Sequence, residues 1–175
     1  MKLDIVYQTD DFIIIYKPCG LSVHKDEHHI QKTYLALSNQ KPKKKQGLIV
    51  GDMQKARNGA WKLCQSKENP AITRFESVSC EPNLRLFILK PQTGKTHQLR
   101  VAMKSLGSPI LGDLLYGKNT ENIDRTYLHA ARLQFEFKGQ AFDVFTLPKE
   151  GEWWHLDGVM SQIQKFGSVN TEPTI

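Results

Sequence analysis

The 175 residues are enough for one domain with a core of its own and too few for two large domains. No apolar run reaches the roughly 20 residues of a membrane-spanning helix, and the first residues lack the apolar centre of a signal peptide. The three cysteines have no metal-binding spacing, which is typical of reduced thiols in a cytoplasmic protein. A formal net charge of +6 favours an acidic partner.

The first part of the chain is predicted to form short strands. Residues 3–7 and 12–16 have the apolar, β-prone composition of two strands joined by a turn. Residues 31–37 form a third strand-like run, whose alternation places Lys32 and Tyr34 on one face. A tyrosine at such a position is either half-buried packing or a flat ring on which a nucleobase can stack.

Antiparallel hairpins are predicted on both sides of the centre of the chain. Residues 71–79 alternate between apolar and polar and are expected to pair with residues 84–90, while Asn58-Gly59 marks an earlier turn. Residues 127–137 and 142–147 are expected to form the last hairpin. These elements predict one mixed α+β domain dominated by antiparallel strands.

The stretch between these hairpins is predicted to contain one short amphipathic helix. Thr96 is a good N-cap, and Gly107 ends the helix after Leu106. Its apolar face consists of Leu99, Ala102, Met103 and Leu106. Its basic face consists of His97, Arg100 and Lys104. A helix with these two faces, entered through a turn at Lys95, suits a polyanion or a buried carboxylate.

Three further features leave alternatives open. The loop Lys41-Pro-Lys-Lys-Lys-Gln46 is either a solvated connection or a phosphate-contacting surface. The histidines and acids of residues 24–29 match no zinc pattern, so a solvated loop is favoured over a metal site at His24, His28 and His29. Thr93-Gly-Lys-Thr96 suggests a nucleotide-binding P-loop, but that motif needs glycine where this chain has Leu89.

Four motifs in order carry a resemblance to a known family. Pro91-Gln-Thr-Gly-Lys-Thr-His-Gln-Leu-Arg100, followed by Leu106-Gly-Ser-Pro-Ile-Leu-Gly-Asp113 and Tyr116-Gly117, closely resembles a signature of the RluA-type pseudouridine synthases. The family's N-terminal motif is similar to Lys17-Pro-Cys-Gly-Leu-Ser-Val-His24. Its active-site tyrosine segment is similar to Lys32-Thr-Tyr-Leu-Ala36, and its late strand is similar to Leu128-His-Ala-Ala-Arg-Leu-Gln-Phe135.

The resemblance implies a pseudouridine synthase fold, a mainly antiparallel mixed sheet with flanking helices and a central RNA-binding cleft, at residues 1–160 with a C-terminal tail at 161–175. It implies isomerisation of uridine to pseudouridine in tRNA or rRNA, with no cofactor and no metal. Arg100 is implied as the partner of a catalytic carboxylate, and Tyr34 as the ring that stacks the extruded base. Contacts with RNA are expected from Lys17, Lys32, Lys90, Lys95, His97, Gln98 and Lys104. We expect a cytoplasmic monomer.

The sequence departs from the family at one essential point. The family's catalytic aspartate lies in a His-Arg-Leu-Asp…Thr-Ser-Gly motif, for which only residues 25–31 are left here. Asp26, Glu27 and Asp113 do not match that motif and are not assigned to catalysis. Either the segment is lost, or the protein contains residues beyond this sequence. The 175 residues alone are predicted to be inactive, and the alternative is a non-catalytic RNA-binding protein derived from a synthase.

Overall fold

The computed structural model describes residues 4–17, 30–118 and 120–168. Ten strands and two α-helices are assigned in these ranges, together with two short 3-10 turns. The strands are β1 Asp4–Gln8, β2 Ile13–Tyr16, β3 Gln31–Ser38, β4 Gln46–Gly51, β5 Met53–Lys55, β6 Trp61–Leu63, β7 Ala71–Glu81, β8 Leu84–Pro91, β9 Leu128–Phe137 and β10 Gln140–Phe145. The helices are α1 Gln98–Ser105 and α2 Asp157–Ser168.

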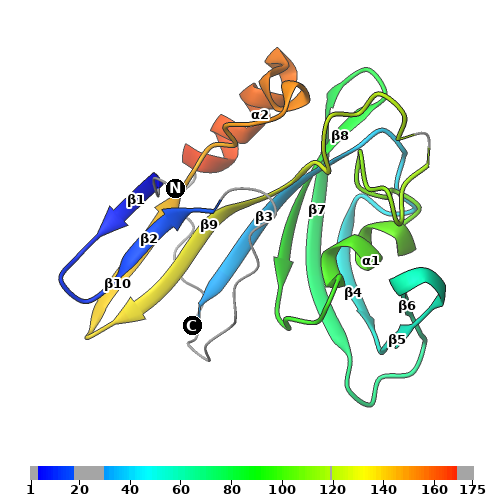
Figure 1. Cartoon of the computed structure of the whole chain (residues 1–175), viewed down its shortest axis with the longest axis horizontal. Helices are drawn as coiled ribbons and strands as arrows, with labels where there is room; N and C mark the ends of the chain where they lie inside the picture. Colours follow the sequence, from blue (N-terminus) through cyan, green and yellow to red (C-terminus); the bar gives the residue numbers. More distant parts are fainter. Residues whose placement is uncertain (1–3, 18–29, 119, 169–175) are drawn as a thin grey trace.

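A six-stranded antiparallel sheet in the order β10-β9-β3-β8-β7-β4 forms the framework. In Figure 1 the sheet runs from β10 at the left to β4 at the right. Helix α1 lies at the right with β4 and the separate β5–β6 hairpin, and α2 lies at the top, near the centre. This arrangement confirms the predicted α+β class with a mainly antiparallel sheet.

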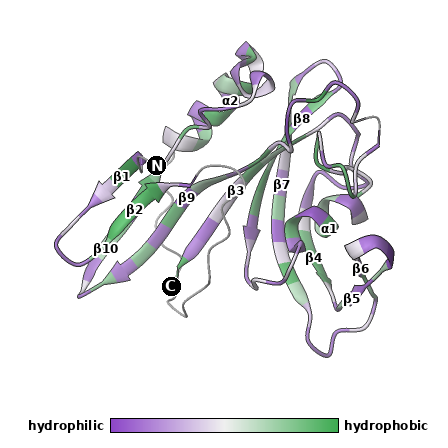
Figure 2. Ribbon diagram, viewed as in Figure 1, coloured by the Kyte–Doolittle hydropathy of each residue, from purple (hydrophilic) through white to green (hydrophobic). Residues whose placement is uncertain are grey.

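The core is centred on β3 and β8. Leu35 and Ala36 on β3, and Leu86 and Phe87 on β8, are all 0% exposed. Since successive strand residues point to opposite faces, the sheet is covered on both faces here. Both helices contribute to this core, α1 through residues such as Met103 and α2 through Val159 and Ile163. Figure 2 shows the alternation of apolar and polar residues along β9.

The three predicted hairpins are confirmed in their pairing, although the last strand is Gln140–Phe145 and not 142–147. The β1–β2, β7–β8 and β9–β10 pairs are antiparallel. Lys138 and Gly139 connect β9 to β10 with φ angles of 50° and 76°. Two successive positive φ angles are typical of the two-residue turns that match strand twist. Asn58 and Gly59 also have positive φ, at the turn that the sequence predicted.

Helix α1 confirms the predicted apolar face but begins later than expected. Leu99, Ala102 and Met103 are buried. Thr96 was predicted as the N-cap, and this is wrong: the helix begins at Gln98, and His97 is the N-cap in a left-handed conformation with φ 56°. No side chain caps the helix start.

The predicted end of α1 at Gly107 is confirmed. Gly107 has φ +79°. Its N–H donates to Lys104 O at 2.9 Å, and the N–H of Ser108 donates to Met103 O at 3.1 Å. These two bonds make up the Schellman arrangement, which satisfies the last helical carbonyls. These two hydrogen bonds therefore fix the direction in which the chain leaves α1.

The C-terminal part of the described chain is helical. Residue 160, the expected domain limit, lies inside α2, and Ile163 beyond it is 0% exposed. Neither α1 nor α2, the helices of the described ranges, has the length and apolar composition that a bilayer-spanning segment requires. The expected gap at residues 25–31 lies almost entirely outside the described residues, as do His24, His28 and His29.

Candidate functional site

Arg100 and Asp113 form a bidentate ion pair in the middle of the signature stretch. The Nε of Arg100 donates to Oδ2 of Asp113 at 2.8 Å, and Nη2 donates to Oδ1 at 2.7 Å. The Asp113 side chain is 0% exposed and the Arg100 side chain is 26% exposed. The pair is therefore closed to solvent at the carboxylate and open at the guanidinium.

The carboxylate of Asp113 also holds the turn that follows it. Its Oδ1 accepts the backbone N–H groups of Leu115 at 3.0 Å and Tyr116 at 3.1 Å. Burial raises the pKa of Asp113, but the hydrogen bond from Arg100, the two backbone N–H groups and the Arg100 charge together bring the pKa below its ordinary value. Asp113 is thus an ionised structural group.

Tyr116 connects this ion pair to the β5–β6 hairpin. Its hydroxyl oxygen accepts the backbone N–H of Trp61 at 2.8 Å and lies 2.9 Å from Nδ1 of His97. Burial and the nearby Arg100 charge lower the pKa of His97, so the neutral ring with Nδ1 as acceptor is favoured. The Arg100 guanidinium lies 4.9 Å from the Tyr116 ring centroid. Three side chains of the signature stretch therefore act as one unit.

Gln98 fixes the turn before α1 to strand β7. Its Oε1 accepts the Thr93 hydroxyl at 2.8 Å and the Lys95 N–H at 3.0 Å. Its Nε2 donates to Ile72 O at 3.1 Å and to the Thr73 hydroxyl at 3.0 Å. The side chain is buried, and both ends of its amide are used inside the protein. We therefore infer a structural role for Gln98 in place of the expected RNA contact.

The predicted lysines near α1 keep their charges at or near the surface. Lys104 is exposed, with Nζ 5.5 Å from the Tyr116 ring centroid. Lys95 is half-buried and donates from Nζ to Asn69 Oδ1 at 2.7 Å. Lys90 on β8 and Lys32 on β3 are also half-buried. All four can present an ammonium group to an anionic partner without first losing an ion pair among the described residues.

Tyr34 and Lys17 line a cavity of about 280 Å³. Tyr34 pairs with Leu89 on β8 and with Ala130 on β9. The β3–β9 register shifts between Thr33 and Tyr34, and such bulges often redirect a side chain beside a functional site. Burial raises the pKa of Tyr34, so its hydroxyl stays protonated near neutral pH. Other polar residues of the lining are Arg125, His129, Arg132, Thr146 and Glu150.

The predicted site residues fall into two groups in the described structure. Arg100, His97 and Lys104 belong to α1 and its N-cap, and none of them is in the lining of the Tyr34 cavity. Tyr34 and Lys17 line that cavity together. The expected meeting of Arg100 with Tyr34 at one catalytic centre is therefore left as a proposal.

Arg132 and His129 are among the residues of this cavity that the sequence did not single out. Arg132 is 4% exposed, and its Nε and Nη2 donate to Asp143 at 2.6 and 2.8 Å. His129 Nε2 lies 2.9 Å from Thr146 O, to which it donates. Burial lowers the pKa of His129. Both residues are in the motif at 128–135, where the sequence predicted the strand but gave no sign of which side chains face a cavity.

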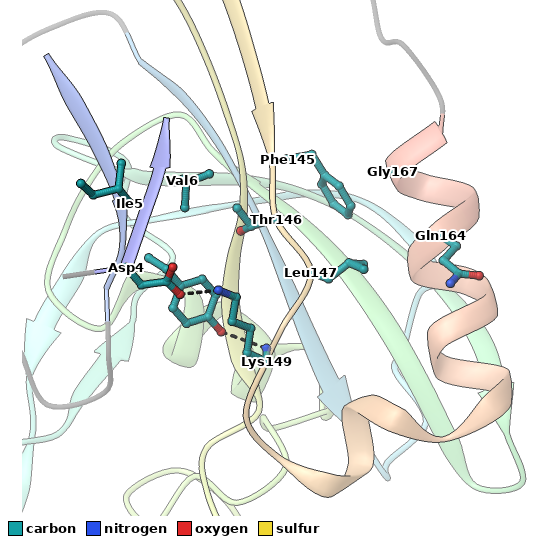
Figure 3. Close-up of a pocket in the computed structure, with 10 residues that line it drawn as sticks. Asp4, Ile5, Val6, Phe145, Thr146, Leu147, Lys149, Gln164 and Gly167 are labelled. Carbon is teal, nitrogen blue, oxygen red and sulfur yellow. Dashed lines mark hydrogen bonds and ion pairs between the residues drawn. The ribbon is translucent and has the colours of Figure 1, made fainter. Parts of the chain in front are cut away.

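A larger cavity of about 560 Å³ lies between β1, the end of β10 and α2 (Figure 3). Lys149 forms an ion pair with Asp4 at this cavity, and its N–H donates to the Tyr16 hydroxyl at 3.0 Å. The rest of the lining is mainly apolar, with Ile5, Val6, Phe145 and Leu147. None of the predicted site residues lines this cavity.

The described residues offer no metal centre. In residues 4–17, 30–118 and 120–168, no group of three or more His, Cys, Asp or Glu side chains is placed to hold a metal ion. Cys64 and Cys80 are free thiols. Burial raises the pKa of Cys80 to about 11, so this thiol is not a ready nucleophile.

Comparisons with known proteins point to one family. The model for RNA pseudouridylate synthases matches residues 25–105. An RNA pseudouridine synthase of Haemophilus influenzae is 56% identical over 216 residues, covering 95% of this chain and 96% of the relative. An RNA pseudouridine synthase of Zymomonas mobilis is 35% identical over 119 residues, covering 65% of this chain and 54% of the relative.

A solved structure agrees with this result at the level of fold. The human protein RNA Pseudouridylate Synthase Domain Containing 1 has a TM-score of 0.71 and 20% sequence identity, covering 99% of this chain and 97% of its own. The confirmed sheet and helices are thus those of pseudouridylate synthase domains.

The Haemophilus alignment also bears on the missing segment. It is 216 residues long, 41 more than the 175 residues of this chain. The relative therefore contains at least 41 residues that have no counterpart here within the aligned region.

Proposed function

Because this chain belongs to the RNA pseudouridine synthase family, we propose that its reaction is the isomerisation of uridine to pseudouridine in RNA. The base is detached from its sugar at nitrogen and rejoined through carbon, so the reaction is redox-neutral. The enzyme must take the base out of its stack, hold it, and place a carboxylate at the sugar–base junction. The substrate RNA is a tRNA or an rRNA in this proposal.

Tyr34 supplies the stacking surface for the extruded base in this proposal. The observation that carries it is the position of Tyr34 at a β-bulge, in the lining of a cavity that also includes Lys17. The cavity volume of about 280 Å³ is near the roughly 300 Å³ at the lower end of ligand pockets. Lys17 offers a charge for the neighbouring phosphate.

Arg100 supplies the cation for the catalytic carboxylate. A guanidinium has five N–H groups, and Asp113 accepts one from Nε and one from Nη2. The side chain is 26% exposed, so its remaining N–H groups can face a second anion. Asp113 then holds Arg100 in position from behind, and the aspartate segment would meet its open side.

The 175 residues alone bind RNA without isomerising it in this proposal. Asp113 is fully buried and committed to Arg100 and the turn, so it cannot reach a sugar. Asp26 and Glu27 lack the flanking residues of the family motif. A protein that keeps the basic helix and Tyr34 but has no catalytic aspartate is an RNA-binding module, which is the alternative function.

Three measurements test this proposal: the intact mass of the protein, RNA binding and isomerisation. The intact mass decides which protein is present, since the chain as given has a mass of 20.0 kDa. RNA labelled with tritium at the uridine carbon that forms the new bond then reports isomerisation by release of the label. We expect binding of RNA and no release from the 20.0 kDa protein, and release from a protein several kilodaltons heavier. Release by the 20.0 kDa chain would refute its inactivity, and failure of both forms to bind RNA would refute the function.

A further inference from the structure

The lysine loop, residues 41–45 between β3 and β4, is fixed to the end of helix α1. The N–H of Lys43 donates to Leu106 O at 3.0 Å, in the last turn of the helix. Just before the loop, the Ser108 hydroxyl donates to Gln40 O and the Ser38 hydroxyl donates to Pro109 O, both at 2.8 Å. The loop is therefore held to the C-cap of α1 by one hydrogen bond of its own, and the residues just before it are held by two more to the segment after α1.

This attachment places Lys43 at the C-terminal end of α1, whose last turn contains Lys104. The four lysines of the loop are exposed, and so is Lys104 in the last turn of the helix. A Cβ at Gly107 would lie 4.0 Å from Cε of Lys43, so the Lys43 stem passes over the helix end. Pro42, in the same loop, is buried and so anchors the loop to the protein. None of these five lysines has an ion pair among the described residues.

We propose that the lysine loop and Lys104 together bind the phosphate backbone of the RNA, as a surface separate from the Tyr34 cavity. This proposal rests on the proposed function and names where the RNA extends beyond the reacting nucleotide. Five cations without carboxylate partners repel one another, and a polyanion relieves that repulsion by neutralising them. Each phosphate contact also releases counterions, which makes affinity strongly salt-dependent.

The composition of the surface favours backbone contact over base reading. The loop contains lysine and proline and no aromatic residue on which a base could stack. Lysine acts as a point charge and does not provide the planar fork with which arginine reads a guanine edge. The surface should therefore bind RNA with little sequence preference and should set the orientation of the substrate.

A charge-matched pair of variants of the full chain tests the proposal. The first variant is K43Q/K44Q/K45Q, and the control is K138Q/K149Q/K165Q, which removes the same charge from the β9–β10 turn, the segment between β10 and α2, and α2 itself. Binding of a fluorescent RNA hairpin is measured by anisotropy over a range of salt concentrations. We expect the loop variant to bind about 10-fold more weakly at low salt and its salt slope to fall by about 2, while the control keeps the slope of the wild type.

Two further comparisons keep the result unambiguous. The variant K43R/K44R/K45R should restore the wild-type slope, because the contact depends on charge. An equal slope for the loop variant and the control would overturn the lysine-loop surface while the proposed function stands. Wild-type protein that binds no RNA would overturn the proposed function itself. A loop variant that loses binding to anionic lipid vesicles but keeps its RNA slope would assign the surface to a membrane and so refute an RNA contact.

Discussion

The guanidinium of Arg100 and the buried carboxylate of Asp113 share two hydrogen bonds, at 2.8 and 2.7 Å, between the first turn of α1 and the loop after it. The family resemblance assigned Arg100 to a different carboxylate, in a segment that this chain lacks. In the described structure Asp113 is the structural partner of this arginine and holds its guanidinium in place.

Breaking this pair should destabilise the fold. The variant D113N keeps the shape of the side chain but removes the charge from a site with no exposure, and we expect a loss of roughly 2–4 kcal/mol in the free energy of unfolding. Urea denaturation measures the loss. D11N, which breaks an exposed pair with Lys138, is the control and should lose no more than about 1 kcal/mol. Equal losses in the two variants would show that Asp113 does not support the fold.

Gln98 should matter for stability and not for RNA binding. The variant Q98A removes a hydrogen-bond partner from one buried group, the Thr73 hydroxyl, and from three part-buried ones, including Ile72 O and the Thr93 hydroxyl, and a loss of about 2 kcal/mol is expected. Q92A, at an exposed position of the same turn, serves as the control and should be close to wild type. At a temperature where both variants are folded, their salt slopes for RNA binding should agree. A reduced slope for Q98A alone would return Gln98 to the RNA interface.

The stability of the protein should fall as the pH is lowered through the range of histidine titration. The pKa values of His97 and His129 lie below the ordinary 6.5, since burial disfavours the charged rings. The unfolded chain therefore binds protons at a higher pH than the folded chain, and the folded state loses stability as pH falls below 6.5. Urea midpoints between pH 7.5 and about 5 measure this effect. In H129Q the dependence should be weaker, and an unchanged dependence would remove His129 as a cause.

Local sequence patterns predicted the strands and the hairpins, whereas contacts between residues far apart in the chain determine the arrangement of the site. Strand alternation and turn residues such as Asn58-Gly59 act within a few residues, so the hairpins followed from the sequence. The start of α1 did not, because His97 adopts its left-handed conformation while its ring bonds the hydroxyl of Tyr116, 19 residues away. Thr96 is a residue type that is typical of an N-cap, but residue type alone cannot reveal the contact between His97 and Tyr116.

The role of Gln98 was hidden for the same reason. Its hydrogen-bond partners on β7 are 25 and 26 residues earlier in the chain. A polar residue next to a basic helix face is equally compatible with RNA contact and with burial until the strand is placed beside it. The pairing of Arg100 with Asp113 is likewise a relationship across a turn, and periodicity along the helix carries no information about it.

Replacing Gly112 with alanine should strongly destabilise the turn that leads into Asp113, the partner of Arg100. Its φ is +75°, and an added Cβ would lie 1.9 Å from Arg125 O. Gly139 has almost the same φ, +76°, but an added Cβ there meets nothing within 4 Å. G139A should therefore lose only the conformational part, about 1–2 kcal/mol, while G112A should lose clearly more, because backbone atoms must also move apart. Urea denaturation of the two variants measures the difference, which isolates the steric contact at Gly112. Equal losses would mean that the loop at Arg125 moves aside freely, and Asp113 would then be held by its hydrogen bonds alone.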